Sequence, residues 1–362
     1  STKVRLVLLG AGHTHAGVLA RLRRRRWANV DVICVSDHAS AAYSGMLPGV
    51  LGGQYERQRM EIDLAGLCDD AGASLVVGTV QDISREDRVL VLDDGRVTPF
   101  DILSIGVGSV PQRAGVQIDV RAHVIPTKPM QTLIDRLDAS LRLTVTPSVS
   151  GCFPVAVVGG GLGGVEIACA LTAHIRSRYG ARLRPQVSLL TREHRVLAGL
   201  APATARRVMA ALSANAITVV TDADVNRVAG DGLHLTDGRR IDAALTLWAT
   251  GAVAPPILQN LHLPQDDRGF LLTDRTLLAH CDPPIFAVGD AGTLRDGPAP
   301  KAGVYAVRQT PILWHNLGAV MQERRLRVFT PQSSFLRLIN IGANHAIGEW
   351  KGVYLKGGGH GG

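Results

Sequence analysis

A strand that runs into a glycine-rich turn and then into a helix occurs twice in this chain, about 150 residues apart. The first copy spans residues 4–12 (VRLVLLGAG), and the second spans residues 155–164 (VAVVGGGLGG). Glycines in such a turn let the backbone N–H groups at the helix N-terminus approach a pyrophosphate, which larger side chains would block. The two turns predict two dinucleotide sites, an arrangement typical of chains that pass a hydride between dinucleotides.

The elements that follow the first turn recur in the same order after the second. The first half predicts a hairpin turn at 93–96, an irregular loop at 42–49, helices at 13–25 and 61–71, and strands at 4–9, 30–36, 74–80 and 102–109. The second half predicts a hairpin turn at 236–239, helices near 130–142, 164–178 and 202–213, and strands at 155–158, 186–190, 216–220 and 245–252. A helix at 302–320 and a β-hairpin made by 334–341 and 346–355 follow. The fold class is therefore α/β, with two Rossmann-like three-layer dinucleotide-binding domains and a small C-terminal β-containing region.

The positive charge of the chain limits the partners that it could bind. The net charge is +8, and Arg21 and residues 23–26 lie at the end of the first expected helix, where the helix dipole favours cations. An acidic partner or a lipid surface is the alternative, and we expect no nucleic-acid binding because no base-reading element accompanies the arginines.

The five cysteines are scattered without a C-x-x-C pair, which indicates a reducing compartment. The chain has neither a signal peptide nor an uninterrupted apolar stretch of about 18 residues, so we expect it in the cytoplasm. The twelve histidines lack metal-ligand spacing, and no metal site is expected.

Four features in a fixed order carry a family resemblance. They are the first glycine turn, the strand end at 106–109 (GVGS), the second glycine turn with the strand end at 249–252 (ATGA), and the segment 288–290 (VGD). This order resembles the pyridine nucleotide-disulfide oxidoreductase superfamily. The resemblance implies an FAD-binding domain at 1–125 and 270–330, an NAD(P)-binding domain at 126–269 and a C-terminal β-hairpin region at 331–362. The implied cofactors are FAD and either NADPH or NADH.

The resemblance also implies which residues lie at each cofactor. Asp290 would accept a hydrogen bond from the ribityl or phosphate region of FAD. The other residues implied for FAD are Gly10, Gly12, His13, Ser44, Pro48, Val80, Gly106, Gly108, Gly289 and Ala302. Gly159, Gly161, Gly164, Thr191 and Gly251 would serve the nicotinamide dinucleotide. Glu166 would lie near its nicotinamide end as a catalytic residue, and the alternative is an acid in the first helical turn that the helix dipole favours.

Several positions depart from the family pattern. His15 stands where the third glycine of the first turn normally allows close packing of helix on strand, so either the helix shifts or the histidine points toward the cofactor, unless it is a half-exposed residue beside the loop. Ser36 or Asp37 would bind the ribose hydroxyls of FAD. Arg192 occupies the corresponding place in the second half and suits a 2′-phosphate, which makes NADPH at least as good a candidate as NADH.

The segment 43–48 (YSGMLP) replaces the redox dithiol of the disulfide reductases. It resembles type II NADH dehydrogenases and sulfide:quinone oxidoreductases. The motifs are most similar to a branch fused N-terminally to selenide, water dikinase, and the segment 301–309 (KAGVYAVRQ) shares this similarity. This segment opens a helix whose N-terminus, together with the catalytic candidate Lys301, would stabilise the charge of a reduced flavin. A solvated loop lysine is the alternative.

The expected activity is transfer of a hydride from NAD(P)H to FAD and of electrons onward to a quinone or another acceptor. Type II dehydrogenases place glutamines near the quinone where this chain has Val304 and Arg308, while Gln309 is retained. A quinone partner implies peripheral contact with the inner face of the membrane. One alternative is sulfide:quinone chemistry, which would use Cys152 and Cys281. The other is an FAD-binding redox or scaffold module without turnover, associated with selenium metabolism.

Overall fold

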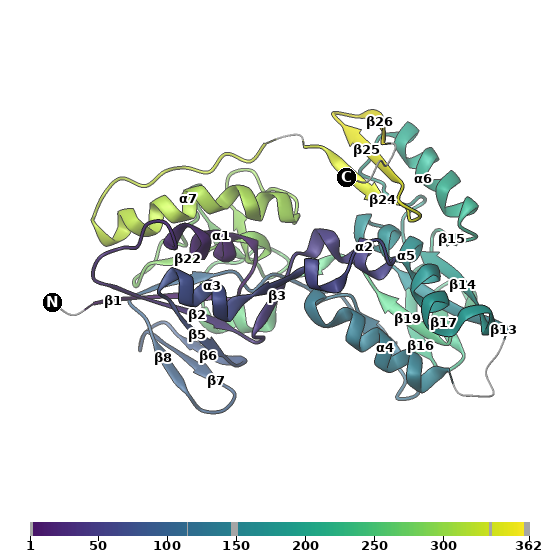
Figure 1. Cartoon of the computed structure of the whole chain (residues 1–362), viewed down its shortest axis with the longest axis horizontal. Coiled ribbons are helices and arrows are strands. Elements are labelled where there is room, and N and C mark those ends of the chain that lie inside the picture. Colours follow the sequence, from purple (N-terminus) through teal and green to yellow (C-terminus); the bar gives the residue numbers. More distant parts are fainter. Residues whose placement is uncertain (1–2, 114, 146–150, 333–334, 358–362) are drawn as a thin grey trace. The chain divides into compact units, whose positions relative to one another are not determined.

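The structure is a computed structural model that describes residues 3–113, 115–145, 151–332 and 335–357. The chain divides into two compact units (Figure 1). Unit 1 comprises Ser1–Tyr43, Glu61–Val110 and Ala252–Pro331. Unit 2 comprises Ser44–Met60, Pro111–Gly251 and Gln332–Gly362.

A five-stranded parallel sheet forms the centre of unit 1, in the order β22-β9-β1-β2-β5. Its strands are β1 (Val4–Leu9), β2 (Val30–Ser36), β5 (Ser74–Val77), β9 (Ile102–Ile105) and β22 (Ile285–Ala287). These segments are almost continuous runs of Val, Ile and Leu, as expected for strands covered on both faces. The expected strands at 4–9 and 30–36 are confirmed residue for residue.

Two helices pack against each other in unit 1. They are α1 (His13–Leu22) and α7 (Gly303–Met321), and the Thr14 hydroxyl donates to the Ala306 carbonyl across the contact at 2.8 Å. A Cβ on Gly17 would come within 2.6 Å of the Thr310 side chain, so the glycine permits this close approach. Figure 1 shows α1 and α7 side by side.

Smaller elements complete unit 1. The helix is α3 (Leu64–Ala71), and the 3₁₀ helices are η5 (Pro256–Leu261) and η6 (Gly289–Ala291). The strands are β3 (Ser40–Ala42), β4 (Glu61–Asp63), β6 (Val80–Ser84), β7 (Val89–Leu92), β8 (Val97–Pro99), β21 (Leu271–Thr273) and β23 (Gly292–Leu294). The helix expected from residue 61 begins at Leu64 instead, because residues 61–63 pair with β3. β7 and β8 form the expected hairpin.

Unit 2 repeats the parallel sheet, in the order β12-β19-β13-β14-β15. Its strands are β12 (Val124–Pro126), β13 (Gly151–Val158), β14 (Leu183–Leu190), β15 (Thr218–Val220) and β19 (Leu245–Trp248). The helices are α4 (Leu133–Thr144), α5 (Leu162–Tyr179) and α6 (Pro202–Ala214), with η3 (Met130–Thr132) and η4 (Gly180–Arg182). A second sheet contains β11 (Gln117–Ile118), β16 (Val225–Ala229), β17 (Gly232–Leu235) and β18 (Arg240–Asp242). A short pair, β10 (Val110–Pro111) with β20 (Ala252–Val253), lies where the chain passes between the two units.

The segment 44–60 folds with unit 2 and contains regular structure: η1 (Ser44–Met46), α2 (Leu47–Leu51) and η2 (Arg57–Arg59). The expectation of an irregular loop at 42–49 is therefore wrong. Pro48 lies in the first turn of α2, where its missing N–H costs nothing, and burial of Leu47 and Leu51 stabilises the turn.

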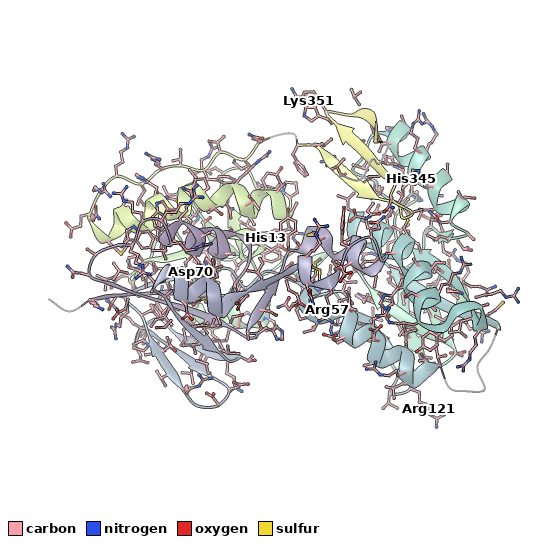
Figure 2. All side chains as sticks on the ribbon, viewed as in Figure 1. His13, Arg57, Asp70, Arg121, His345 and Lys351 are labelled. Carbon is pink, nitrogen blue, oxygen red and sulfur yellow. The ribbon has the colours of Figure 1, made fainter. Side chains whose placement is uncertain are left out.

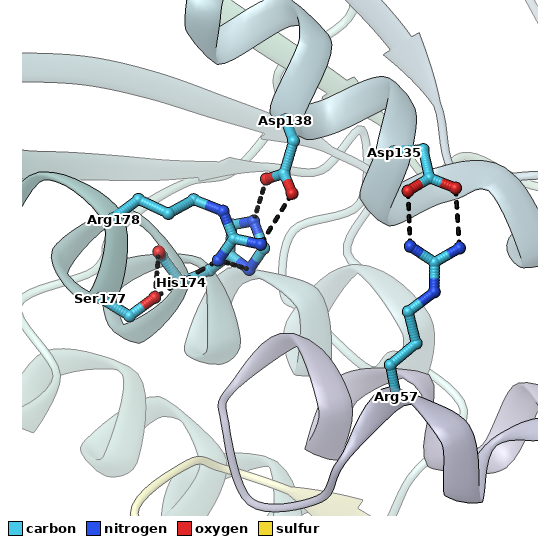
Figure 3. A network of polar contacts seen from close by, with 6 residues as sticks. All are labelled: Arg57, Asp135, Asp138, His174, Ser177 and Arg178. Atoms are coloured by element: carbon cyan, nitrogen blue, oxygen red, sulfur yellow. Dashed lines mark hydrogen bonds and ion pairs between the residues drawn. The ribbon is translucent and has the colours of Figure 1, made fainter.

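Two groups of polar contacts tie helices of unit 2 together (Figure 3). Arg57 of η2 forms a two-pronged ion pair with Asp135 of α4, at 2.5 and 2.7 Å. Asp138 of α4 accepts bonds from His174 and Arg178 of α5, both at 2.7 Å. The His174 ring is buried, and burial lowers its pKa.

A three-stranded antiparallel sheet closes unit 2. It contains β24 (Arg337–Asn340), β25 (Ala346–Trp350) and β26 (Val353–Gly357), and His345 marks the turn before β25 in Figure 2. The expected hairpin is confirmed, but residues 346–355 do not form one strand. Lys351 and Gly352 adopt positive φ values of 49° and 76°, which fold the chain into a further hairpin.

Candidate functional site

The first glycine turn is held by close backbone contacts inside unit 1. Gly10 has a φ of +86°, and a Cβ there would lie 2.5 Å from the Gly106 carbonyl oxygen. Gly12 caps the N-terminus of α1, with its Cβ position 3.3 Å from the same oxygen. Gly108, with a φ of +71°, has no described atom within 4 Å of a Cβ. The ends of β1 and β9 and the start of α1 thus meet in a tight backbone turn that is open at Gly108, which we call the first cradle.

His15 is fully buried beneath this cradle. Its Nδ1 lies 2.5 Å from the Gly10 carbonyl oxygen, and its Nε2 lies 2.7 Å from the Ser104 hydroxyl. The carbonyl only accepts, so Nδ1 carries the proton and Nε2 accepts from Ser104. Burial lowers the pKa of His15 to about 4, which keeps the ring neutral. His15 is therefore neither half-exposed nor free to bind a ligand, because it cross-links the turn to β9.

Asp290 and Gly289 lie on η6 in the same unit. The Ser109 hydroxyl donates to Asp290 Oδ2 at 2.6 Å, and the Gly289 N–H donates to Gln309 Oε1 at 2.7 Å. These bonds connect η6 to the segment after β9 and to α7. A pocket in this region is lined by Asp290, Thr293, Lys301, Tyr305 and Gln309, among others.

Lys301 immediately precedes Ala302, the N-cap of α7. Its ammonium donates to the Gly292 carbonyl at 2.6 Å and to the Thr293 hydroxyl at 2.9 Å, and it lies 4.1 Å from the Phe270 ring centroid. Burial lowers the pKa of Lys301 to about 8, against the attraction of Asp290 and Asp266. The interpretation as a solvated loop lysine is wrong, since the side chain fastens β23 to the start of α7.

The remaining candidates for the first site are distributed over both units. His13 begins α1, meets Tyr43 edge-on at a centroid distance of 5.1 Å, and has its pKa lowered by burial despite the attraction of Asp290 (Figure 2). Ser36 is buried at the end of β2, and the Asp37 carboxylate is 52% exposed. Val80 packs against the apolar core of unit 1, whereas Ser44 and Pro48 belong to unit 2.

The second glycine turn has the same construction in unit 2. Gly159 has a φ of +130°, and a Cβ there would lie 2.3 Å from the Ala249 carbonyl oxygen. A Cβ on Gly164 would lie 1.8 Å from the Gly159 carbonyl oxygen, so α5 packs directly on the turn. Gly161, the N-cap of α5, and Gly163 have no described atom within 4 Å of a Cβ. This second cradle is open at the helix N-terminus.

The strand ends beside the second cradle carry the other candidates. Thr191 is buried, and its hydroxyl lies 2.6 Å from a Cβ position on Gly160. Arg192 is exposed immediately after it. Gly251 is exposed, and its carbonyl accepts from the Gln112 N–H at 2.8 Å.

Glu166 lies beyond the first turn of α5. Burial raises the pKa of its carboxyl group to about 7, although the Asn340 N–H donates to Oε1 at 2.9 Å and favours the charged form. A helix dipole would lower this pKa rather than raise it. Because the first turn of α5 contains no acidic residue, the interpretation as a first-turn acid is wrong, and Glu166 is instead a carboxyl group bonded by the Asn340 N–H.

The cysteines lie in different surroundings. Cys152 is exposed on β13 in unit 2, and Cys281 is half-buried in unit 1 with a pKa raised by burial. Cys34 and Cys169 are buried, and burial raises the pKa of Cys169 to about 12. In the described ranges, no three His, Cys, Asp or Glu side chains form a group that could hold a metal ion. None of the helices that the structure describes is both long and apolar enough to span a bilayer.

Three residues of these sites make hydrogen bonds that the sequence does not reveal: Ser104, Ser109 and Asn340. Each acts through a partner far away in the sequence, at separations of 89, 181 and 174 residues. Single serine and asparagine residues carry no pattern that identifies such a partner. Their roles follow from the fold alone.

Comparisons with known proteins identify a family and relatives that are similar to this chain. The model of the family "Pyridine nucleotide-disulphide oxidoreductase" matches residues 4–316. Demethylphylloquinone reductase NdbB of Synechocystis sp. is 30% identical over 211 residues, which cover 56% of this chain and 50% of NdbB. An alternative NAD(P)H-ubiquinone oxidoreductase, C1, of Arabidopsis thaliana is 25% identical over 320 residues, which cover 82% of this chain and 58% of that enzyme. The chain thus spans about half the length of NdbB and less than two thirds of the Arabidopsis enzyme.

Solved structures share the fold. NDH2 from Plasmodium falciparum in complex with NADH superposes with a TM-score of 0.82 at 15% identity, covering 98% of this chain and 92% of that one. The sulfide:quinone oxidoreductase from Aquifex aeolicus gives a TM-score of 0.76 at 16% identity, covering 96% and 83%. The match to the family model includes both cradles and the strands that build them, so the chain belongs to the pyridine nucleotide-disulphide oxidoreductase family.

Proposed function

We propose that the chain is an FAD-dependent oxidoreductase that takes a hydride from NADH or NADPH and passes electrons to a quinone. The observation that carries the proposal is the pair of glycine cradles, one in each unit and both at helix N-termini. Membership of the family supports the same assignment.

The first cradle fits the pyrophosphate of FAD. Gly12 and Gly108 leave backbone exposed, and the first turn of α1 contains no acidic residue that would repel an anion. Asp290 offers a carboxylate on η6, and Ser36 or Asp37 at the end of β2 would bind ribose hydroxyls. When bound, FAD supplies the chemistry, since its ring accepts a hydride and releases electrons to an acceptor.

Residues at the start of α7 would tune that chemistry. The N-terminus of α7 carries a partial positive charge and no acid in its first turn. Lys301 holds this helix start against β23, so its role is to fix the positive end in place and to add a nearby charge. Both effects would stabilise negative charge on a reduced flavin.

The second cradle fits NAD(P)H by the same reasoning. Gly161 and Gly163 leave the N-terminus of α5 open, and its first turn contains no acid. Arg192 follows β14 and is exposed, which suits a 2′-phosphate and favours NADPH. Glu166 would hold the nicotinamide end through its carboxyl group.

A quinone acceptor is favoured by the names of the two relatives, a demethylphylloquinone reductase and an NAD(P)H-ubiquinone oxidoreductase. The chain itself adds one observation: Nη1 of Arg308 on α7 is buried and has no hydrogen-bond acceptor among the described residues. A buried donor of this kind usually finds a partner in a ligand or a water, and a quinone carbonyl is such an acceptor. Peripheral contact with the cytoplasmic face of a membrane would bring the protein to this substrate. The motif at 301–309 supports a relation to selenium metabolism.

An acceptor screen tests this function. Purified protein reconstituted with FAD receives NADH or NADPH together with a short-chain ubiquinone, a menaquinone analogue, sulfide or a selenium species, and nucleotide oxidation is followed. We expect quinone-dependent oxidation of the nucleotide that survives alkylation of the cysteines. Turnover with sulfide that alkylation abolishes would replace the proposal with sulfide:quinone chemistry, and bound FAD that no nucleotide reduces would favour a module without turnover.

A further inference from the structure

Asn340 of β24 is the centre of a small hydrogen-bonded cluster in unit 2. Its backbone N–H donates to Glu166 Oε1 at 2.9 Å. Its side-chain Nδ2 donates to Gln54 Oε1 at 2.6 Å, and its Oδ1 accepts from the Gly342 N–H at 3.0 Å. Both polar atoms of the Asn340 side chain are therefore engaged, which fixes the backbone N–H that points at the Glu166 carboxylate.

The strand that carries Asn340 does not belong to the dinucleotide-binding sheet. β24 pairs with β25, and separate contacts fasten these strands to the helices of unit 2. The Asn215 side chain at the end of α6 donates to the Ile341 carbonyl at 3.1 Å. The Glu349 carboxylate, 4% exposed as a residue, accepts from the Ala201 N–H at 3.0 Å. The position of Asn340 is thus set by the C-terminal sheet and not by the parallel sheet behind Glu166.

The segment that carries Gln54 is also anchored to a helix of unit 2. It lies between α2 and η2, and the two-pronged pair of Arg57 with Asp135 anchors η2 to α4 (Figure 3). Two chain segments outside the parallel sheet, 44–60 and 337–350, therefore meet at Asn340. Glu166 lies two residues after Gly164, the glycine on which α5 packs against the turn of the second cradle.

We propose that Asn340, locked by Gln54, is a positioning residue that orients the Glu166 carboxyl group toward the nicotinamide end of the second dinucleotide. This inference rests on the proposed function. A carboxyl group has two oxygens, and fixing Oε1 defines the direction of the other. The C-terminal sheet then completes the second dinucleotide site instead of merely covering unit 2.

The surroundings of Glu166 make the effect of the Asn340 bond on its pKa measurable. The group that reaches it from β24 is the neutral Asn340 N–H, and Gln54 bonds to the Asn340 side chain. The charge of Glu166 in turn adds to burial in raising the pKa of the Cys169 thiol on the same helix. Losing the Asn340 bond removes a stabiliser of the carboxylate, so the pKa of Glu166 rises above its present value of about 7.

The test uses Gln54→Ala in the full-length, FAD-reconstituted protein, with Asn215→Ala as the matched control. Both changes remove one amide that holds the C-terminal segment, but Asn215 contacts neither Glu166 nor the Asn340 side chain. Carboxyl ¹³C NMR, with the Glu166 signal identified by Glu166→Gln, reports the pKa, and fluorescence quenching reports the Kd of NADH. For Gln54→Ala we expect a pKa increase of about half a unit or more and a Kd increase of about threefold to tenfold.

A double-mutant cycle completes the design. In the Glu166→Gln background, Gln54→Ala should leave the Kd of NADH unchanged, because the group that it positions has been replaced. Equal effects of Gln54→Ala in both backgrounds, or a Glu166 pKa that Gln54→Ala and Asn215→Ala change alike, would overturn the inference. A wild-type protein that binds neither nucleotide would instead refute the proposed function, while the NMR titration would still decide whether Asn340 acts on Glu166.

Discussion

Replacing His15 by alanine should destabilise unit 1, and the cost should depend on pH in a defined direction. The substitution leaves the Gly10 carbonyl and the Ser104 hydroxyl without their partner and removes a fully buried ring. Lost hydrogen bonds to buried groups and the cavity together cost about 3 kcal/mol at neutral pH. Loosening of the turn should also weaken retention of FAD.

The pH dependence follows from the neutral state of the ring. Burial lowers the pKa of His15 from 6.5 to about 4, so this group contributes full stability above pH 6.5 and loses it as the pH falls toward 4. The difference between these two pKa values corresponds to about 3 kcal/mol of the free energy of unfolding, of which about 2 kcal/mol is lost by about pH 5. The alanine variant lacks this titration. The difference between wild type and variant should therefore shrink from about 3 kcal/mol at about pH 7.5 to about 1 kcal/mol at about pH 5.

The assay is urea unfolding at these two pH values, followed by tryptophan fluorescence. Trp27 and Trp314 stack on each other in unit 1, with ring centroids 4.3 Å apart. Trp248 and Trp350 lie in unit 2, so replacing them by phenylalanine confines the signal to unit 1. His38→Ala, at a half-buried histidine of the same unit whose side chain is 32% exposed, serves as the control and should change stability little. A cost of His15→Ala that is the same at both pH values would refute the buried, neutral cross-link.

Further predictions concern the two cradles. Gly161→Ala places a methyl group in open space, so it should leave the melting temperature unchanged while raising the Kd of NADH about tenfold or more. Gly164→Ala should fail to fold stably, because its Cβ would meet the Gly159 carbonyl. Equal melting temperatures of the two variants would contradict this contrast. Lys301→Met should destabilise unit 1 by about 1–3 kcal/mol, because the Gly292 carbonyl and the Thr293 hydroxyl lose their donor. It should also lower the flavin midpoint potential, because a positive charge near the reduced flavin is lost. An unchanged potential in spectroelectrochemistry would remove the lysine from the mechanism. Arg192→Ala should weaken NADPH binding about tenfold and NADH binding little, and the reverse pattern would contradict the assignment of the 2′-phosphate.

The sequence predicted the local features of the fold and of both cradles. Gly10 and Gly159 stand in turns whose conformation only glycine adopts easily, so their positions are visible in the residue pattern. The apolar runs at 4–9 and 30–36 likewise define their strands by themselves. Expectations that depend on neighbouring residues along the chain were therefore confirmed.

Features that depend on distant partners could not be predicted in this way. His15 occupies a glycine position, and its actual partner Ser104 lies 89 residues away. The segment 44–60 is rich in turn residues, but burial of Leu47 and Leu51 in unit 2 converts part of it into a helix. Glu166 follows the family pattern, yet its raised pKa results from burial and its orientation from Asn340, neither of which the local sequence reveals.

Anaerobic titration of the FAD-reconstituted protein with NADPH and NADH tests the central claim most directly. If the two cradles hold dinucleotides that react with each other, about one equivalent of nucleotide should bleach the visible flavin absorbance within seconds, and Gly161→Ala should require much more nucleotide for the same change. Flavin that stays oxidised while the nucleotide demonstrably occupies the second cradle would contradict the account.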